Sequence, residues 1–336
     1  MNTNNNSNLT KARITAEHRE RYALTCEYGD TYGRLKTKEY YEGDQLFPTT
    51  GDYVLIDYNP SGDSRIVETL PRKTFFSRRN PTPGRGEQAV AANFDYVFIM
   101  QSLNMDFNPN RLERYLTLAW QSGACPVILL TKADLVEDYS SQLASVSMVA
   151  PGVDVYAVSA KTGYGLESLS PYLTPGKTIV FLGSSGIGKS SLVNALAGKD
   201  IMSVNGIRED DSKGRHTTTH RQLINLNCGA MIIDTPGMRE LGMWDVTVGL
   251  GEAFSDVEQF LGLCKFSNCK HQSEPGCAIK AAIASGELSE KRWLNYQNLD
   301  REAQYSESKG DYLRQKQARN KSISKWSKQM KASKHK

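Results

Sequence analysis

The sequence predicts a multidomain α/β protein, in which a small N-terminal β-barrel precedes a doubly wound parallel sheet and a mostly helical C-terminal domain. Three observations predict this class. Short strands separated by turn signals fill residues 20–79, apolar strands alternate with helical stretches over residues 93–248, and cysteines crowd around a histidine after residue 260. At 336 residues the chain is long enough for two or three domains, each with its own core.

The N-terminal third of the chain divides into a leader, a barrel and a linker. Residues 1–19 start with an Asn-rich stretch that lacks the apolar core of a signal peptide, and we expect a disordered leader there. Residues 20–79 contain the strand-like runs YALTCEY, GDYVLIDY and DSRIVETLP between Gly-Asp turns. This pattern favours an oligonucleotide-binding (OB) barrel and leaves an SH3-like barrel open. Residues 80–92, which include NPTPGRGEQ, are expected to be a linker.

Residues 93–248 alternate apolar strands with helices. The strands DYVFIMQSL, PVILLTKADL, VDVYAVSA, TIVFLG and AMIIDTPG are separated by helical stretches that include residues 110–123, 141–150 and 165–173. Continuously apolar strands of this kind belong to a parallel sheet that is covered on both faces. Such a sheet binds ligands at the carboxyl ends of its strands, so the residues that follow each strand are the candidate site.

Residues 183–190, GSSGIGKS, match the phosphate-loop pattern G-x-x-x-x-G-K-[ST] between a strand and a helix. The glycines let backbone N–H groups converge on phosphate oxygens, and the helix N-terminus adds partial positive charge. We expect Lys189 to reach the β- and γ-phosphates and Ser190 to ligate Mg²⁺. In IIDTPG, Asp234 would hold Mg²⁺ through water and the Gly237 N–H would meet the γ-phosphate. These motifs specify a nucleoside triphosphate without naming its base.

Two motifs at other strand ends name the base. In Thr131-Lys132-Ala133-Asp134, the carboxylate can accept hydrogen bonds from N1–H and the exocyclic amine of guanine, a donor pair that adenine lacks. Ser159-Ala160-Lys161 matches the second base loop, whose backbone N–H contacts guanine O6. The predicted GTP-binding residues are Thr131, Lys132, Ala133, Asp134, Ser159, Ala160, Lys161, Gly183, Ser184, Ser185, Gly186, Ile187, Gly188, Lys189, Ser190, Ser191, Asp234 and Gly237.

The motifs follow one another in the order base, base, phosphate, metal, whereas common GTPases begin with the phosphate loop. A doubly wound sheet binds its ligand at the same edge in whatever order the chain visits the strands. A circular permutation therefore preserves the site. It also lets the segment after Asp234-Thr235-Pro236-Gly237 lead directly into the C-terminal domain.

The segment between the phosphate loop and Asp234 carries the candidate hydrolytic residues. One of the threonines at 217–219 should supply a second hydroxyl to Mg²⁺, and we take Thr218 for this role in catalysis beside Lys189. Met238 stands where Ras-like enzymes carry the glutamine that orients water, so slow intrinsic turnover is expected. His216 is the candidate for placing the water, the alternative being an exposed histidine without a catalytic role.

The C-terminal region combines a metal motif with a basic tail. Cys264, Cys269, His271 and Cys277 form a Cys₃His set, which predicts one structural zinc ion in a domain over residues 249–305. Residues 306–336 form a tail, and residues 309–336 of this tail contain ten Lys or Arg and only one acidic residue. The tail either solubilises the chain or contacts a polyanion such as nucleic acid.

The remaining cysteines and the hydropathy bear on location. Cys26, Cys125 and Cys228 are scattered along the chain and are expected to be buried free thiols. The pattern does not suggest an extracellular disulfide frame, and no apolar run approaches the roughly 20 residues that a membrane span needs. We therefore expect a cytoplasmic protein without a membrane partner.

Over residues 20–300 the sequence resembles the circularly permuted ribosome-small-subunit-dependent GTPase A (RsgA, YjeQ or YloQ) family. The resemblance rests on AANFDYVFIMQSL, NRLERYL, TKADL, SAKTG, GSSGIGKSSLVNAL, GRHTTTH and IIDTPGMREL, together with the metal cluster. Thr131 stands where the family usually has Asn, and Ile187 where Val is usual. The resemblance implies an OB-fold, a GTPase domain and a zinc domain that act in late maturation of the small (30S) ribosomal subunit.

The expected protein is a monomeric GTPase that converts GTP to GDP and phosphate, slowly alone and faster on the small subunit. Its expected partners are 16S rRNA within that subunit and ribosome assembly factors. Two other classes stay open. One is a non-catalytic RNA-binding module that uses GTP to stabilise its fold, which Met238 keeps open; the other is a P-loop ATPase or small-molecule kinase, which Asp134 disfavours.

Overall fold

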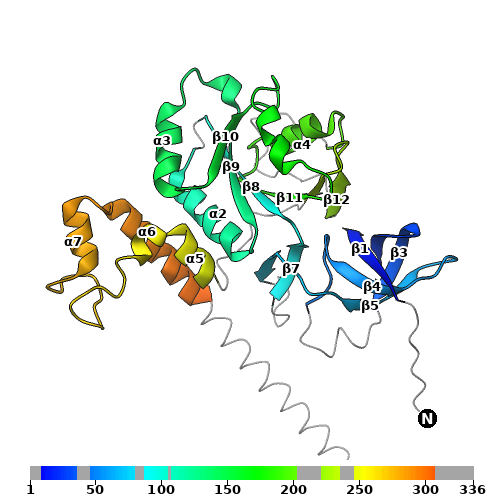
Figure 1. The fold of residues 1–336 in the computed structure, drawn as a ribbon, viewed down its shortest axis with the longest axis horizontal. Coiled ribbons are helices and arrows are strands. Elements are labelled where there is room, and N and C mark those ends of the chain that lie inside the picture. The colour runs from blue at the N-terminus through cyan, green and yellow to red at the C-terminus, as the bar shows by residue number, and fades with distance from the viewer. Residues whose placement is uncertain are drawn as a thin grey trace, which may run out of the picture. The chain divides into compact units, whose positions relative to one another are not determined.

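The computed structural model describes residues 9–35, 46–79, 87–104, 107–202, 221–234 and 246–306 (Figure 1). The chain divides into two compact units. The first unit comprises residues 1–77 and 89–241, and the second comprises residues 78–88 and 242–336. Among the described residues, none of the helices has the length and apolar character needed to cross a membrane.

The first unit begins with a closed five-stranded barrel, drawn in blue in Figure 1. Its strands are β1 (Thr10–Glu17), β2 (Tyr22–Cys26), β3 (Gly29–Leu35), β4 (Tyr53–Asp57) and β5 (Ser64–Thr69). They pair in the order β1-β2-β3-β5-β4, β4 returns to β1, and β3 runs parallel to β5. The barrel core consists of Ala12, Ile14, Leu24, Val54, Ile56 and Ile66. This arrangement confirms the predicted OB-type barrel.

Two parts of the predicted N-terminal organisation are wrong. Residues 10–17 lie in the predicted disordered leader but form β1, because Ala12 and Ile14 alternate with polar residues and enter the barrel core. Residues 87–92 lie in the predicted linker but form β7 (Glu87–Ala92), which pairs with β6 (Phe75–Arg79). The Ala and Val side chains of β7 are buried, a signal that the neighbouring Pro and Gly residues obscured.

The remainder of the first unit is a mostly parallel sheet, which confirms the predicted doubly wound architecture. Its order is β10-β9-β8-β11-β13-β12, and only β12 is antiparallel to its neighbour β13. The strands are β8 (Tyr96–Ser102), β9 (Cys125–Thr131), β10 (Asp154–Val158), β11 (Thr178–Leu182), β12 (Gln222–Asn225) and β13 (Met231–Asp234). The strands of the parallel part are apolar because side chains are buried on both faces: Phe98 and Leu129 lie on one face, and Val97 and Ile128 on the other.

The helices of this unit are α2 (Pro109–Gln121), α3 (Ser140–Val149) and α4 (Lys189–Ala197). Helix α2 begins where the side chain of Asn108 accepts a hydrogen bond from the Arg111 N–H, with Pro109 at the first helical position. It packs against β8 and β9 and beside α3. The predicted helix at 165–173 is instead the 3₁₀ helix η2 (Glu167–Tyr172), because Pro171 has no N–H for an α-helical hydrogen bond.

The second unit is helical over most of its described part. It contains α5 (Thr247–Ala253), α6 (Ser255–Glu258), α7 (Ala278–Ser285) and a helical stretch over residues 290–306. The guanidinium of Arg292 donates to both carboxylate oxygens of Asp256 and to the carbonyl of Ala253, and it lies over the Phe254 ring. These contacts join the last helical stretch to α5 and α6.

The scattered cysteines are free thiols, but the expectation that they are buried is wrong. Cys125 and Cys228 are exposed, and Cys26 is half-buried. Cys125 is the first residue of β9, and Cys228 lies in the turn between β12 and β13. Strand ends and turns reach solvent even where the strands between them are buried.

Candidate nucleotide and metal sites

The predicted base, phosphate and metal motifs meet at one edge of the sheet. Strands β9, β10, β11 and β13 are parallel members of the same sheet and end at Thr131, Val158, Leu182 and Asp234. Val158 is the register partner of Thr131, and the phosphate loop follows Leu182 directly. We call the carboxyl ends of these four strands, with the loops that follow them, the nucleotide edge.

The phosphate loop has the backbone that its glycines predict. Gly186 and Gly188 have φ values of +73° and +102°, a left-handed region that residues with a Cβ rarely adopt. Gly188 is also the N-cap of α4, so the first N–H groups of this helix point out of its N-terminus at the nucleotide edge. The loop therefore offers the concave set of N–H donors that phosphate groups require.

Lys189 and Asp234 form an ion pair between the phosphate loop and the end of β13. The Lys189 Nζ lies 2.6 Å from Asp234 Oδ1, and the Asp234 side chain is only 2% exposed. The other carboxylate oxygen, Oδ2, is buried and finds no hydrogen-bond partner among the described residues. A buried carboxylate with one unsatisfied oxygen is costly, and waters bound to Mg²⁺ would satisfy it. The residues therefore fit the predicted ion.

Thr131 ties the first base motif to the phosphate loop. Its buried hydroxyl donates to the carbonyl of Ile187 at 2.8 Å. The two residues are 56 positions apart in the chain, and both depart from the usual residues of the family named above. A threonine can thus supply the contact between these loops through one short hydrogen bond.

A second tie joins the two base motifs to each other. The Ser159 hydroxyl donates to Asp134 Oδ1 at 2.7 Å, and the side-chain hydroxyls of Tyr139 and Tyr164 lie 3.1 Å apart. Lys132 adopts a left-handed conformation with φ of 60°, and the 3₁₀ turn η1 (Ala133–Leu135) follows it. Asp134 is exposed, as a carboxylate that receives a base must be. The hydrogen bonds of Ser159 and of the tyrosines had no signal in the sequence.

The predicted zinc ligands come together in the second unit. The ligand atoms of Cys264, Cys269, His271 and Cys277 all lie within 4.8 Å of one another. Cys264 Sγ is 4.0 Å from Cys277 Sγ, and each sulfur is 3.5 Å from His271 Nδ1. A tetrahedral site with Zn–S bonds of about 2.3 Å separates its sulfurs by about 3.8 Å, so this set fits zinc. We call residues 264–277 the zinc loop.

Backbone N–H groups organise the zinc loop. The Ala278 N–H donates to Cys264 Sγ at 3.3 Å, which lowers the pKa of this thiol and favours the thiolate that zinc binds. The Glu274 carboxylate accepts backbone N–H bonds, including those of its own residue, Lys270 and Gln272, which lower its pKa to about 2. Glu274 was missed by the sequence analysis, because an acidic residue between metal ligands gives no distinctive pattern.

Several predicted residues lie outside the described part of the chain. His216, Thr217, Thr218 and Thr219 belong to the segment before β12, and Gly237 and Met238 belong to the motif after Asp234. Residues 307–336 of the basic tail also lie outside the described part. The remaining GTP-binding candidates, including Ser184, Ser185, Ser190, Ser191, Ala160 and Lys161, are placed at the nucleotide edge by the strands they follow. Their contacts with a nucleotide stay predictions.

Comparisons with known proteins agree with this site. The family model described as RsgA GTPase matches residues 69–244. A small ribosomal subunit biogenesis GTPase RsgA 1 of Listeria monocytogenes serovar 1/2a is 49% identical over 294 residues, which cover 87% of this chain and 83% of the relative. The crystal structure of YjeQ from Thermotoga maritima is 26% identical with a TM-score of 0.63, covering 87% of this chain and 97% of that structure.

A second solved structure bears on the order of the motifs. YloQ, described as a circularly permuted GTPase, has a TM-score of 0.58 with 24% identity, and the match covers 89% of this chain and 96% of that structure. At this identity the likeness speaks for the fold, which agrees with the order of base and phosphate motifs seen here. With a family model over more than half of the chain and relatives close to half identical, the chain belongs to the RsgA GTPase family.

Proposed function

We propose that this protein hydrolyses GTP in the late maturation of the small ribosomal subunit, slowly alone and faster when the subunit is bound. One observation carries the proposal. The guanine-reading motifs follow β9 and β10 on one side of β8, and the phosphate and metal motifs follow β11 and β13 on its other side. Direct hydrogen bonds link Thr131 to Ile187 and Ser159 to Asp134. The names of the curated relatives support the biological role.

Each group at the nucleotide edge has a distinct task in the proposed reaction. The Asp134 carboxylate selects guanine by accepting from its two donors, and the phosphate-loop N–H groups bind the phosphates. Lys189, now paired with Asp234, turns its ammonium toward the β- and γ-phosphates. Ser190, Asp234 and Thr218 would hold Mg²⁺, which would supply positive charge to neutralise the charge that develops on the phosphates.

Placement of the attacking water is assigned to His216. Met238 replaces the glutamine of Ras-like enzymes, and a thioether cannot orient water as an amide does. The imidazole of His216 can accept a hydrogen bond from water, and it lies next to the threonine run in the sequence. Because Met238 cannot orient the water, hydrolysis is expected to be slow for the protein alone and faster when the small subunit is bound.

The second unit supplies a proposed structural zinc site and contacts to RNA. Cys264, Cys269, His271 and Cys277 would supply all four ligands of a tetrahedral zinc ion, which would leave no position for a substrate. The basic tail over residues 306–336 and the barrel are proposed to contact 16S rRNA, since clustered Lys and Arg displace counterions from phosphates. The protein is proposed to act as a cytoplasmic monomer that meets other assembly factors on the subunit.

The decisive experiment measures phosphate release from GTP with and without purified small subunits over a salt series. We expect slow release alone and a large increase with small subunits, which shrinks as salt rises because RNA contacts are electrostatic. Replacement of His216 by Ala should abolish the increase while leaving GTP binding intact. Stimulation that is absent at every salt concentration would favour a non-catalytic RNA-binding module instead.

A further inference from the structure

One strand, β12, separates the barrel from β13, the strand that ends at the proposed metal ligand Asp234. Strand β1 pairs with β12, and β12 pairs with β13, so the barrel and the nucleotide-binding sheet share one continuous set of hydrogen-bonded strands. The register puts Ala16 of β1 opposite Gln222 of β12, and Gln222 opposite Asp234 of β13. Strands lie about 4.8 Å apart, so Ala16 is about 10 Å from the residue proposed to hold Mg²⁺.

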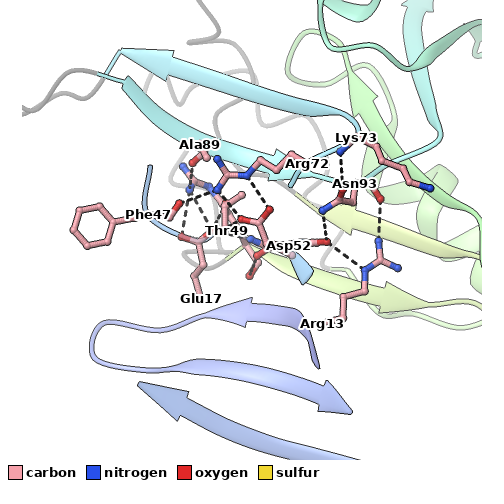
Figure 2. A network of polar contacts seen from close by, with 12 residues as sticks. Arg13, Glu17, Phe47, Thr49, Asp52, Arg72, Lys73, Ala89 and Asn93 are labelled. Carbon is pink, nitrogen blue, oxygen red and sulfur yellow. Dashed lines mark hydrogen bonds and ion pairs between the residues drawn. The ribbon is translucent and has the colours of Figure 1, made fainter. Parts of the chain in front are cut away.

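An ion pair fixes β1 to β12 beside this row. The Arg221 guanidinium lies 3.3 Å from Glu17 Oε2, and it also donates to the carbonyl of Ala89. Glu17 is held in turn by the Thr49 hydroxyl and the Thr50 N–H of the barrel. Figure 2 shows Glu17 and Thr49 together at one end of the network that joins the barrel to the sheet.

Arg13 forms the other end of the same network. Its guanidinium donates to the Thr178 hydroxyl at 2.9 Å and to the Asn93 carbonyl at 3.0 Å, and it contacts the Met231 sulfur (Figure 2 shows Arg13 beside Asn93). Thr178 and Met231 are the first residues of β11 and β13. The barrel therefore holds the amino ends of the two strands whose carboxyl ends lead to the phosphate loop and Asp234.

The packing at this joint leaves little room for sliding. A Cβ added to Gly51 would lie 2.1 Å from the Ala92 carbonyl oxygen and 2.9 Å from Ile233 Cδ1, so the barrel backbone touches the sheet directly. Strands β12 and β13 have four residues each. Short strands at the edge of a sheet fray easily, and β1 converts β12 from an edge strand into an interior one.

We propose that Glu17 and Arg221 are positioning residues for the GTPase reaction, because their ion pair holds the Ala16–Gln222–Asp234 row and thereby sets the place of the Asp234 carboxylate. Neither residue belongs to the proposed nucleotide-binding set. In this proposal the barrel helps to position the Asp234 carboxylate, in addition to any contact that it makes with a partner. The proposal rests on the role of Asp234 in holding Mg²⁺ given under Proposed function.

The test uses the full-length chain and the substitution Glu17→Gln. Glutamine still accepts from Thr49 and Thr50 through its amide oxygen, but it cannot form the ion pair with Arg221. Release of a fluorescent GDP is measured over a Mg²⁺ series, and GTP hydrolysis is measured at saturating Mg²⁺. We expect the Mg²⁺ concentration for half-maximal slowing of release to rise about threefold to tenfold, with a similar fall in kcat and an unchanged KM for GTP.

A double-substitution cycle separates the ion pair from general damage. Arg221→Gln should have the same effect as Glu17→Gln, and the double variant should be no worse than the more affected single variant. Arg221→Lys keeps the charge and should recover most of the Mg²⁺ response. If Glu17→Gln proves too unstable to assay, Arg221→Gln and Arg221→Lys provide the same contrast between a broken and a retained ion pair. The matched control is Asp57→Asn, which breaks an exposed pair with Arg65 within the barrel and should change nothing.

The outcomes distinguish this inference from the proposed function. If the wild-type chain responds to Mg²⁺ and the folded Glu17 and Arg221 variants give the same curve, the positioning role is overturned. Additive losses in the double variant, or an equal loss in Asp57→Asn, overturn it as well. If the wild-type chain itself shows no Mg²⁺ response, the role of Asp234 is wrong and the inference falls with it.

Discussion

The nucleotide edge and the zinc loop each gather several functional groups, but they hold them by different means. At the nucleotide edge, Thr131, Leu182 and Asp234 end buried strands, and the sheet fixes where each strand ends. In the zinc loop, His271 is separated from Cys264 and Cys269 by loop backbone, and only Cys277 leads directly into a helix, α7. Cys277 is also the one fully buried ligand of the four.

This difference indicates that the zinc loop depends on its ligand for its fold, whereas the nucleotide edge does not. Hydrophobic burial along β9, β11 and β13 stabilises the nucleotide edge before any nucleotide arrives. The zinc loop has few buried apolar groups, and its closely spaced thiols would repel one another as thiolates without a cation between them. Removing nucleotide should therefore leave the first unit folded, whereas removing zinc should unfold part of the second.

The largest expected effect is loss of the metal through Cys277→Ala. We expect the second unit to lose more than about 4 kcal/mol of unfolding free energy, because metal binding and folding of such loops are coupled. Zinc content by elemental analysis and thermal unfolding by circular dichroism measure the change, and GTP affinity should stay as in the wild type. Cys228→Ala, at an exposed turn, is the control. Full zinc content in Cys277→Ala would contradict the assignment.

The next effect is expected at the nucleotide edge, from Lys189→Ala. We expect GTP affinity to fall about a hundredfold, because the ammonium that meets the phosphates is removed. The first unit should stay folded but lose about 1–3 kcal/mol, since the buried Asp234 loses its partner. Fluorescent nucleotide binding and thermal unfolding measure the two quantities separately.

Lys177→Ala is the matched control for this change. Lys177 precedes β11 at the opposite end from the phosphate loop and pairs with Asp95 at 3.0 Å on the surface. An exposed pair of this kind contributes about 1 kcal/mol or less, and the residue is far from the nucleotide edge along the strand. If Lys177→Ala lowered GTP affinity as much as Lys189→Ala, the loss could be attributed to reduced stability, and a direct contact between Lys189 and the phosphates would be contradicted.

The sequence predicted the part of the fold that local pattern controls. The apolar strands that end in phosphate, base and metal motifs predicted the parallel sheet. The helix expected at residues 110–123 is found at Pro109–Gln121. Motif spacing was enough to predict the set of zinc ligands, because three cysteines and one histidine in a short stretch can all reach one metal ion. These features depend on residues close together in the chain.

What the sequence did not reveal depends on partners far apart in the chain. Strand β1 was missed because the Asn-rich stretch at the N-terminus indicated a disordered leader. The buried guanidinium of Arg13 in this strand donates to Thr178, which lies 165 positions away. The Glu17–Arg221 pair spans 204 positions. No local period or motif encodes such contacts, so the joint between barrel and sheet appears only in three dimensions.

A smaller effect is expected from Thr131→Val, which tests whether the hydrogen bond of Thr131 or the sheet alone positions the phosphate loop. Valine has nearly the same shape as threonine but cannot donate to the Ile187 carbonyl, so GTP affinity should fall about tenfold. Thr131→Asn, the residue usual in the family, can donate again and should recover affinity. Competition between GTP and fluorescent GDP measures both variants. An unchanged affinity in Thr131→Val would mean that the sheet alone positions the phosphate loop.

The smallest expected effect is that of Glu274→Gln in the zinc loop. The Glu274 carboxylate accepts from the N–H groups of Lys270, Gln272 and Ser273, and the neutral amide has only one oxygen to offer them. The ligands stay intact, so zinc should still bind, but transfer of zinc to a colorimetric chelator at neutral pH should become about two- to threefold faster. Glu287→Gln, an exposed acid after α7 that accepts from the Ser285 hydroxyl, is the control. Equal transfer rates in both variants would mean that the ion alone organises the loop, which would make the contrast with the nucleotide edge sharper still.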